Sequence, residues 1–260
     1  MNLLDKDVLL VDKPAGMSSF GVVARVRRIL TEQMRADYLR RGLTLPKKAK
    51  VGHAGTLDPF ATGLLILLLG REGTRKAQEF LKLDKRYEAT IRLGATSSTG
   101  DVEGEIRTTV FGAMDRQPAV AGVGPILLAR RQKEPRETVV PNLASVQVVL
   151  ERFVGEGEQR VPAYSAVKIN GRRAYDLARK GIEVEMPVRK VRIYELELVS
   201  YEWPELKIRC KVSSGTYIRA LGEDIGAALG VGGYLTELRR TEIGEFSVKD
   251  AVTLDEIMRG

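Results

Sequence analysis

Six consecutive aliphatic residues, Leu64–Leu69, limit the folds open to this chain more than any other stretch. A run of this kind fits a β-strand that is buried on both faces, because a half-buried strand would alternate apolar and polar residues. Such a strand needs cover from other elements on each side. The run is too short to cross a bilayer as a helix, which takes about 20 residues. We therefore interpret it as an interior strand of a soluble protein.

Shorter patterns predict further strands. Apolar and polar residues alternate at 87–93 and at 206–212, as they do in half-buried strands, and Asp7–Val11 reads as a short buried strand. The alternation at 206–212 places Cys210 in the core, where we expect an inert cysteine.

Two stretches have the apolar spacing of helices. The first runs to Leu30 from an N-cap at Ser18 or Ser19, and the second covers Thr216–Leu229 and stops at Gly230. Strands and helices come in irregular order. We therefore predict an α+β fold with a mixed central β-sheet, flanking helices and loop insertions.

Two segments lack a sustained pattern. Residues 31–50 are expected to form a basic insertion, an exposed and partly mobile loop, and residues from about 111 to 138 form a surface excursion rich in Gly, Pro and charges. The strands on either side of the excursion show no separate cores. We therefore expect one domain over residues 1–260.

The charge balance points to a polyanionic partner. The chain has 42 Lys and Arg against 34 Asp and Glu, which gives a formal charge of +8 and a sequence pI of about 9.6. An excess of cations favours nucleic acid by counterion release, although a merely solvated basic surface is the alternative. Clustering strengthens the prediction, because many cations directly precede one glycine-rich stretch. They are Arg25, Arg27, Arg28, Arg35, Arg40, Arg41, Lys47, Lys48 and Lys50.

Composition also narrows the chemistry. With one cysteine, Cys210, and one histidine, His53, the chain can form neither an intramolecular disulfide nor a Cys/His zinc cluster. The start of the chain lacks the basic-then-apolar order of a signal peptide. We therefore expect a cytoplasmic monomer with no metal, no cofactor and no membrane segment.

The glycine-rich stretch 52–63 reads Gly-His-Ala-Gly-Thr-Leu-Asp-Pro-Phe-Ala-Thr-Gly. Pro59 restricts Asp58 to extended geometry and the glycines permit tight turns, so the stretch can hold one carboxylate with little freedom. It lacks the Gly-Lys-Ser/Thr ending of a phosphate-binding loop and the spacing of a dinucleotide fingerprint. The residues themselves leave open a turn in which Asp58 only accepts bonds from local amides.

This stretch resembles the pattern GHTGTLDPLATG of TruB-type pseudouridine synthases, with Ala54 and Phe60 as departures. Further matches occur in the family's order on both sides of it. They are VDKPAGMSS at 11–19, KRY at 85–87, VPAYSAVK at 161–168, SGTYIR at 214–219 and LRR at 238–240. The resemblance therefore covers nearly the whole chain.

The resemblance implies a pseudouridine synthase fold and the isomerisation of uridine 55, in the T-loop of tRNA, to pseudouridine. It assigns Asp58 as the catalytic nucleophile or base and Arg219 as the partner that keeps this aspartate ionised. Tyr87 would stack on a uracil flipped out of the RNA. Tyr217 and Leu238 would lie beside the target base.

The resemblance also assigns contacts to the rest of the RNA. His53 matches a histidine that meets the displaced RNA, and Lys13, Lys168 and Arg240 would contact phosphates. Because the sequence ends at Gly260, soon after the last matched motif, we expect that the C-terminal RNA-binding domain of bacterial members, the PUA domain, is absent. The basic residues between 35 and 50, and the excursion near Arg130, Arg131 and Lys133, would then compensate for it.

Two other functions remain as alternatives. One is a tRNA-binding or tRNA-folding protein without catalysis, against which the presence of Asp58, Tyr87 and Arg219 argues. The other is a relative that works under a guide RNA in a larger particle, against which the bacterial spacing of the motifs argues.

Overall fold

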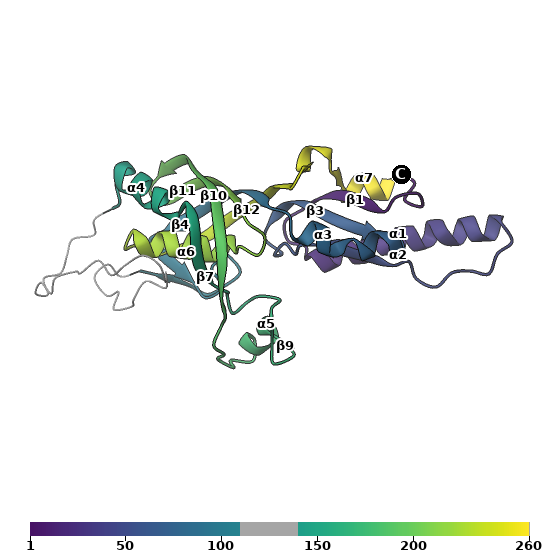
Figure 1. Ribbon diagram of the computed structural model, residues 1–260, viewed down its shortest axis with the longest axis horizontal. Coiled ribbons are helices and arrows are strands. Elements are labelled where there is room, and N and C mark those ends of the chain that lie inside the picture. Colours follow the sequence, from purple (N-terminus) through teal and green to yellow (C-terminus); the bar gives the residue numbers. More distant parts are fainter. Residues whose placement is uncertain (110–139, 260) are drawn as a thin grey trace, which may run out of the picture. The chain divides into compact units, whose positions relative to one another are not determined.

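The protein is described by a computed structural model that covers residues 1–109 and 140–259 (Figure 1). The strands are β1 (Val8–Lys13), β2 (Val51–Ala54), β3 (Thr62–Leu69), β4 (Lys85–Leu93), β5 (Ala95–Ser97), β6 (Ile106–Thr108), β7 (Gly155–Arg160), β8 (Lys168–Ile169), β9 (Arg172–Arg173), β10 (Val188–Glu202), β11 (Glu205–Val212), β12 (Gly233–Ile243), β13 (Phe246–Ser247) and β14 (Val252–Thr253). The helices are α1 (Ser19–Arg40), α2 (Gly70–Arg75), α3 (Ala77–Leu81), α4 (Leu143–Phe153), α5 (Ala174–Ala178), α6 (Ile218–Ala228), α7 (Leu254–Arg259) and the short 3-10 helix η1 (Val248–Asp250). The excursion expected at about 111–138 lies outside the described residues.

Ten of these strands form one mixed sheet. Their hydrogen-bonded order is β14-β1-β3-β12-β4-β11-β10-β7, with β2 paired to β3 and β13 paired to β12. The β1–β14 and β3–β12 pairs are parallel, whereas β1–β3 and β10–β11 are antiparallel. The predicted α+β fold with a mixed sheet is confirmed.

The described chain divides into two compact units. Unit 1 comprises residues 1–88 and 238–260, and unit 2 comprises residues 89–237. Strands β4 and β12 each contribute residues to both units. The two divisions therefore fall within strands, away from the excursion at 111–138, and the single-domain expectation stays a prediction.

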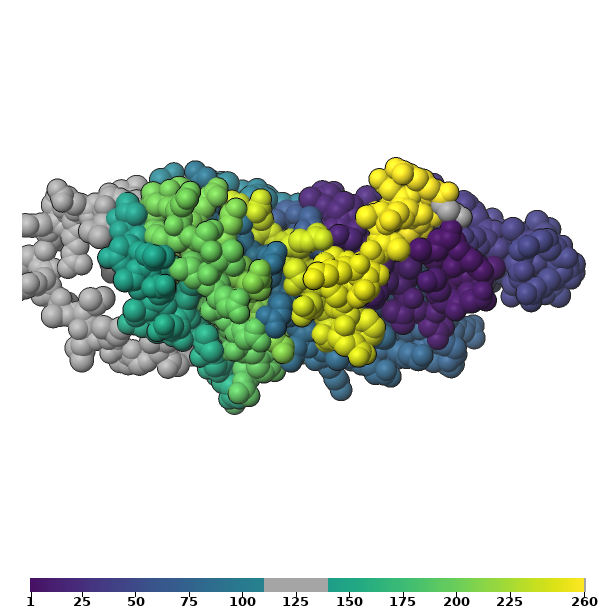
Figure 2. Space-filling view, turned by 90° about the horizontal axis from the view of Figure 1, so that it is seen from above, coloured from purple at the N-terminus to yellow at the C-terminus, as the bar shows by residue number. Residues whose placement is uncertain are grey.

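The core of unit 1 lies on both faces of β3. One face packs with α1 and α7 through a cluster that includes Leu65, Leu67, Val26 and Ile257. The other face, with Leu64, Ile66 and Leu68, packs with Ile243 and with the partly buried Phe80 of α3. The prediction of a strand buried on both faces is confirmed, because each face of the sheet has its own helical cover. In Figure 2 the yellow C-terminal segment lies against the purple N-terminal segment, as the parallel β1–β14 pair requires.

Helix α1 is longer than the sequence pattern predicts. Its N-cap is Ser18, whose side chain accepts a hydrogen bond from the Gly21 amide, but the helix continues past Leu30 to Arg40. The prediction of a loop from residue 31 is wrong for residues 31–40. These residues include good helix formers, and Asp37 forms an i,i+4 ion pair with Arg41. Local propensity therefore extends the helix beyond the last buried position, Thr31.

Unit 2 is built around β10 and β11, which pair over most of their length. Helix α4 packs against β10 and α6. The predicted strand at 206–212 is confirmed, and Cys210 is fully buried. Helix α6 is also confirmed, although it begins at Ile218, two residues later than predicted, with Tyr217 as its N-cap.

Within the described residues, none of the helices has the length and apolar character needed to span a membrane. The longest helix, α1, carries charged residues from Arg25 to its end at Arg40.

Candidate functional site

The candidate site of unit 1 is a seven-residue loop, 55–61, which we call the Asp58 loop. The preceding residues 52–54 belong to β2 and the following Thr62 and Gly63 to β3, so the glycine-rich stretch is a hairpin whose strands pair antiparallel. Gly63 adopts a φ of 101°, and a Cβ there would lie 2.2 Å from the backbone oxygen of Arg240. Only glycine fits at this parallel contact between β3 and β12.

Arg240 holds the first part of the Asp58 loop. Its side chain is 1% exposed, and its Nη2 donates to the Gly55 carbonyl at 3.0 Å. Nη1 donates to the Thr56 carbonyl at 3.5 Å, and Nε donates to Leu64 at 2.8 Å. A buried guanidinium is costly unless its N–H groups are satisfied, so these carbonyls must stay in place around it.

Ser19 holds the middle of the loop. Its Oγ donates to the Leu57 carbonyl at 2.9 Å and accepts from the Leu57 amide at 2.8 Å. Both polar groups of the residue before Asp58 are thus bonded to one buried hydroxyl at the start of α1. Leu57 itself is buried.

Lys13 holds the end of the loop. Its Nζ donates to the carbonyls of Pro14 at 2.8 Å, Met17 at 2.6 Å and Pro59 at 3.1 Å. The Gly16 amide donates to the same Pro59 carbonyl at 2.9 Å. Together, Lys13, Ser19 and Arg240 form what we call the loop clamp, which fixes backbone groups on both sides of Asp58.

The clamp corrects two of the expected RNA contacts. Lys13 and Arg240 were expected to contact phosphates, but they are 0% and 1% exposed and their charged groups bind backbone carbonyls. The sequence pattern could not separate these roles, because a cation that faces RNA and one that crosslinks a loop are the same residue type.

Burial and the positive charge of Arg240 affect the pKa values of two neighbouring basic side chains, His53 and Lys85. Burial, with the positive charge of Arg240 in addition, lowers the pKa of His53 below its usual value, so the imidazole is neutral at pH 7. The same two causes, in the same order, lower the pKa of Lys85 to about 8. Lys85 donates to the carbonyls of Leu81 and Leu83 at the end of α3. The role of His53 in meeting displaced RNA stays a prediction.

The remaining expected residues of unit 1 lie on its two shared strands. Tyr87 in β4 and Leu238 in β12 are each 7% exposed. Their assigned contacts with a target base stay predictions.

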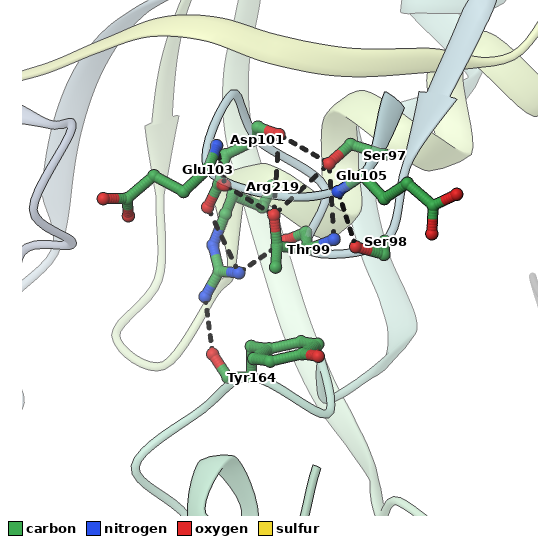
Figure 3. A network of polar contacts seen from close by, with 8 residues as sticks. All are labelled: Ser97, Ser98, Thr99, Asp101, Glu103, Glu105, Tyr164 and Arg219. Carbon is green, nitrogen blue, oxygen red and sulfur yellow. Dashed lines mark hydrogen bonds and ion pairs between the residues drawn. The ribbon is translucent and has the colours of Figure 1, made fainter. Parts of the chain in front are cut away.

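In unit 2, Arg219 is the centre of a buried polar network (Figure 3). Its side chain is 5% exposed and lies 3.5 Å from the Asp101 carboxylate, which is 3% exposed. Nη1 donates to the Thr99 carbonyl at 2.6 Å, and Nη2 donates to the Tyr164 carbonyl at 2.8 Å. Arg219 is therefore buried on its helix, and its predicted pairing with Asp58 stays a prediction.

Hydrogen bonds from neighbouring residues of the same loop hold the Asp101 carboxylate in place. Its Oδ1 accepts from the Thr99 hydroxyl at 2.6 Å and from the Glu103 amide at 2.9 Å, and its backbone oxygen accepts from the Ser97 hydroxyl. The network confines the guanidinium of Arg219 to one place. Moving it away would leave the buried Asp101 carboxylate without its ion-pair partner, and breaking a buried ion pair costs several kcal/mol. The sequence analysis missed Asp101. The polar, glycine-containing turn around it and the need of a buried arginine for an acid were the available signals.

Two acids of α6 lie next to this network. Burial, together with the charges of Asp224 and Asp101, raises the pKa of Glu223 to about 7, while Arg219 opposes the shift. Burial raises the pKa of Asp224 to about 6. Gly100, at a φ of 75°, lies against the Glu223 carboxyl, where a Cβ would come within 3.1 Å of it. Glu223 is another residue that the sequence analysis did not single out.

Tyr217 and Lys168 differ in how they are held. The Tyr217 amide donates to the Gln159 side chain at 2.8 Å, and the same amide group of Gln159 donates to the Tyr217 carbonyl at 3.0 Å. Tyr217 also packs against a cluster that includes Val161 and Met186. Lys168 lies exposed in the β8–β9 hairpin, and its phosphate contact stays a prediction. Across residues 1–109 and 140–259, no group of three or more His, Cys, Asp or Glu side chains is placed to hold a metal ion.

Comparison with protein families gives two matches. The model described as "TruB family pseudouridylate synthase (N terminal domain)" matches residues 41–122 and 128–218. The model described as "tRNA pseudouridylate synthase B C-terminal domain" matches residues 219–259. The expected absence of a PUA domain is a separate matter and stays a prediction.

Individual relatives agree with the family matches. The chain is 41% identical to a tRNA pseudouridine synthase B of Azoarcus sp. strain BH72, over 96% of this chain and 69% of the relative. It is 40% identical to the enzyme of that name in Phocaeicola vulgatus, over 98% of this chain and 93% of the relative. Among solved structures, a chain of a Cbf5-Nop10-Gar1 complex matches at 29% identity with a TM-score of 0.59. This match covers 95% of our chain and about half, 52%, of the other.

The raised pKa of Glu223 predicts how stability depends on pH. Since the carboxyl has a higher pKa when folded, its protonated form stabilises the fold fully below about pH 4.5, and this contribution is lost as the pH rises to about 7. We expect wild type to lose about 1–3 kcal/mol relative to Glu223→Gln over this interval, allowing for partial exposure. Urea unfolding of both proteins between about pH 4 and about pH 8 measures the difference. A constant difference across the range contradicts the assignment.

Proposed function

Because the chain belongs to the TruB family of pseudouridylate synthases, we propose that it isomerises uridine 55 of the tRNA T-loop to pseudouridine. The reaction breaks the C1′–N1 bond of the nucleotide, turns the uracil and forms a C1′–C5 bond. The proton lost from C5 is balanced by the one that N1 gains. The product is an isomer, so neither an oxidant nor a group donor takes part.

The observation that carries the proposal is the clamped Asp58 loop. One carboxylate on a rigid loop suits this chemistry, in which it either bonds to C1′ or removes the 2′ proton while the base detaches. The clamp fixes the Gly55, Leu57 and Pro59 backbone on both sides of Asp58. Preorganisation of this kind places a reacting group without a further cost at the moment of reaction. We propose Asp58 as the catalytic residue.

Other residues receive proposed roles from the matched motifs. Arg219 would pair with Asp58, and its guanidinium is already confined by Asp101 in its own unit. Tyr87 would stack on the flipped uracil, with Tyr217 and Leu238 beside the base. For Tyr217, the two hydrogen bonds between its main chain and the Gln159 side chain support a fixed main chain at this position.

The choice of a tRNA substrate rests on the degree of identity. The relatives named tRNA pseudouridine synthase B are 40–41% identical to the chain, whereas the Cbf5 complex match is 29% identical. This favours direct action on tRNA over action under a guide RNA. We further propose that the protein works as a monomer in the cytoplasm.

We expect wild type to convert uridine 55 of unmodified tRNA, and Asp58→Asn to lose turnover by more than the roughly 10²- to 10⁴-fold typical of a general acid or base. The amide is nearly isosteric but is neither an effective nucleophile nor a base, so the fold and the tRNA affinity should persist. The measurement is mapping of pseudouridine in the incubated tRNA. Binding by wild type without product would favour a non-catalytic tRNA-binding protein, and near wild-type turnover by Asp58→Asn would remove it from the mechanism.

We expect Tyr87→Leu to lower the single-turnover rate by about 10- to 100-fold, since stacking of a base on an aromatic ring is worth roughly 1–3 kcal/mol. Affinity for tRNA should largely persist, because phosphate contacts supply most of the binding. Tyr87→Phe keeps the ring and should stay close to wild type. Equal losses of affinity and rate in Tyr87→Leu would argue against stacking.

A further inference from the structure

Residues 32–48, which comprise the second half of α1 and the segment after it, form an arm whose two ends lie side by side on unit 1. We call it the basic arm. The two ends of the arm are tied together at its base. The Thr31 hydroxyl donates to the Arg27 carbonyl at 2.6 Å and accepts from the Ala49 amide at 3.0 Å. Arg27 in turn donates to the Val51 carbonyl at 3.2 Å. The arm therefore leaves and rejoins unit 1 at a fixed place.

The arm adds little to the hydrophobic core. The buried residues of α1 end at Thr31, and no residue of the arm is buried. In Figures 1 and 2 this part of α1 projects from the strands of its own unit. Near its base, Met34 packs against the core of unit 1 and the Gln33 side chain bonds to the backbone of Met1 and Leu3. Beyond these contacts, a short helix without packing is only marginally stable in water. Packing of the hydrophobic core therefore does not explain why the chain forms this arm.

The arm and its base carry a large excess of positive charge. Residues 25–50 contain nine Lys or Arg and two acids, a formal charge of +7, against +8 for all 260 residues. Eight of the nine cations are exposed. Such a density of like charge is unfavourable for folding alone, and it attracts a polyanion strongly.

These cations follow one face of α1 and then return along the other limb of the arm. Arg25, Arg28 and Arg35 are three and seven residues apart, which places them on one side of the helix. The ion pair between Arg28 and Glu32 is weak, since the two groups are 4.0 Å apart with about 70% of each side chain exposed. Asp37 forms closer ion pairs with Arg40 at 3.6 Å and with Arg41 at 3.1 Å. Arg35, Lys47 and Lys48 form no ion pair with the described residues.

We propose that the basic arm binds the phosphodiester backbone of the tRNA substrate, an inference that rests on the proposed function. Together with Arg25 and Arg28 at its base, the arm presents cations along α1 over about 15 Å between Arg25 and Arg35, at 1.5 Å per residue, a span that covers several phosphates. The contact is independent of base sequence, because side chains of this kind reach phosphates rather than base edges. The arm raises affinity for tRNA and leaves recognition of the target uridine to the Asp58 loop.

The test compares two triple variants of equal charge. The arm variant carries Arg35→Gln, Lys47→Gln and Lys48→Gln, and the control carries Lys6→Gln, Lys82→Gln and Lys249→Gln at exposed sites of the same unit. Affinity for unmodified tRNA is titrated over a salt series. We expect the arm variant to bind about 10-fold or more weakly, with a salt slope lower by about two to three units, and the control to stay near wild type.

Two results overturn the proposal. One is an arm variant whose affinity and salt slope equal those of wild type, and the other is an equal loss in the control, which would reflect net charge alone. If circular dichroism shows that Arg35→Gln shortens α1, the double variant Lys47→Gln and Lys48→Gln, which lies outside the helix, repeats the test with an expected slope change of about two units. Pseudouridine formation by wild type on the same tRNA is scored separately. A protein that binds through the arm but makes no product retains this inference and loses the proposed function.

Discussion

The bonds between buried cations and the backbone of the Asp58 loop are the interactions on which the candidate site depends. Lys13 and Arg240 come from opposite ends of the chain, yet each donates to carbonyls of the same seven-residue loop. Ser19 adds both polar groups of Leu57. A short loop with glycines would otherwise have many conformations, and fixing each residue costs about 1–2 kcal/mol. The clamp replaces that freedom with one arrangement.

In unit 2, Arg219 is likewise buried and bonded to backbone carbonyls. Arg219 is confined by Asp101 and by two carbonyls, so the protein uses buried arginine and lysine to hold backbone in place. Cations that are buried in this manner are not available to a polyanion. Contacts with a polyanion then fall to the exposed cations, of which residues 25–50 and residues 168–192 carry eight each. The protein thus uses its buried cations to hold the backbone and its exposed cations to make the surface basic.

Patterns that depend on burial alone were predicted well from the sequence. The interior strand at Leu64–Leu69 and the alternating strand at 206–212 are confirmed, and of the two caps considered, Ser18 and Ser19, the structure has Ser18, because periodicity and capping are local. The end of α1 was predicted wrongly, since residues 31–40 are helical through propensity and ion pairs rather than apolar spacing. The burial of Lys13 and Arg240 could not be predicted, because it depends on contacts between residues 46 and 185 positions apart. The resemblance supplied the candidate residues, whereas only the structure shows what holds them.

We propose that the loop clamp positions Asp58 for reaction, and the variant Ser19→Ala tests this role most directly. This change removes the hydroxyl that bonds Leu57, whereas the control Ser18→Ala removes a neighbouring hydroxyl that caps α1. The measurement is the single-turnover rate of pseudouridine formation with saturating tRNA. Since a displacement of about 1 Å can cost about 100-fold, we predict a fall of about 10-fold or more for Ser19→Ala, with little change for Ser18→Ala. A folded Ser19→Ala protein that reacts at the wild-type rate would contradict the account.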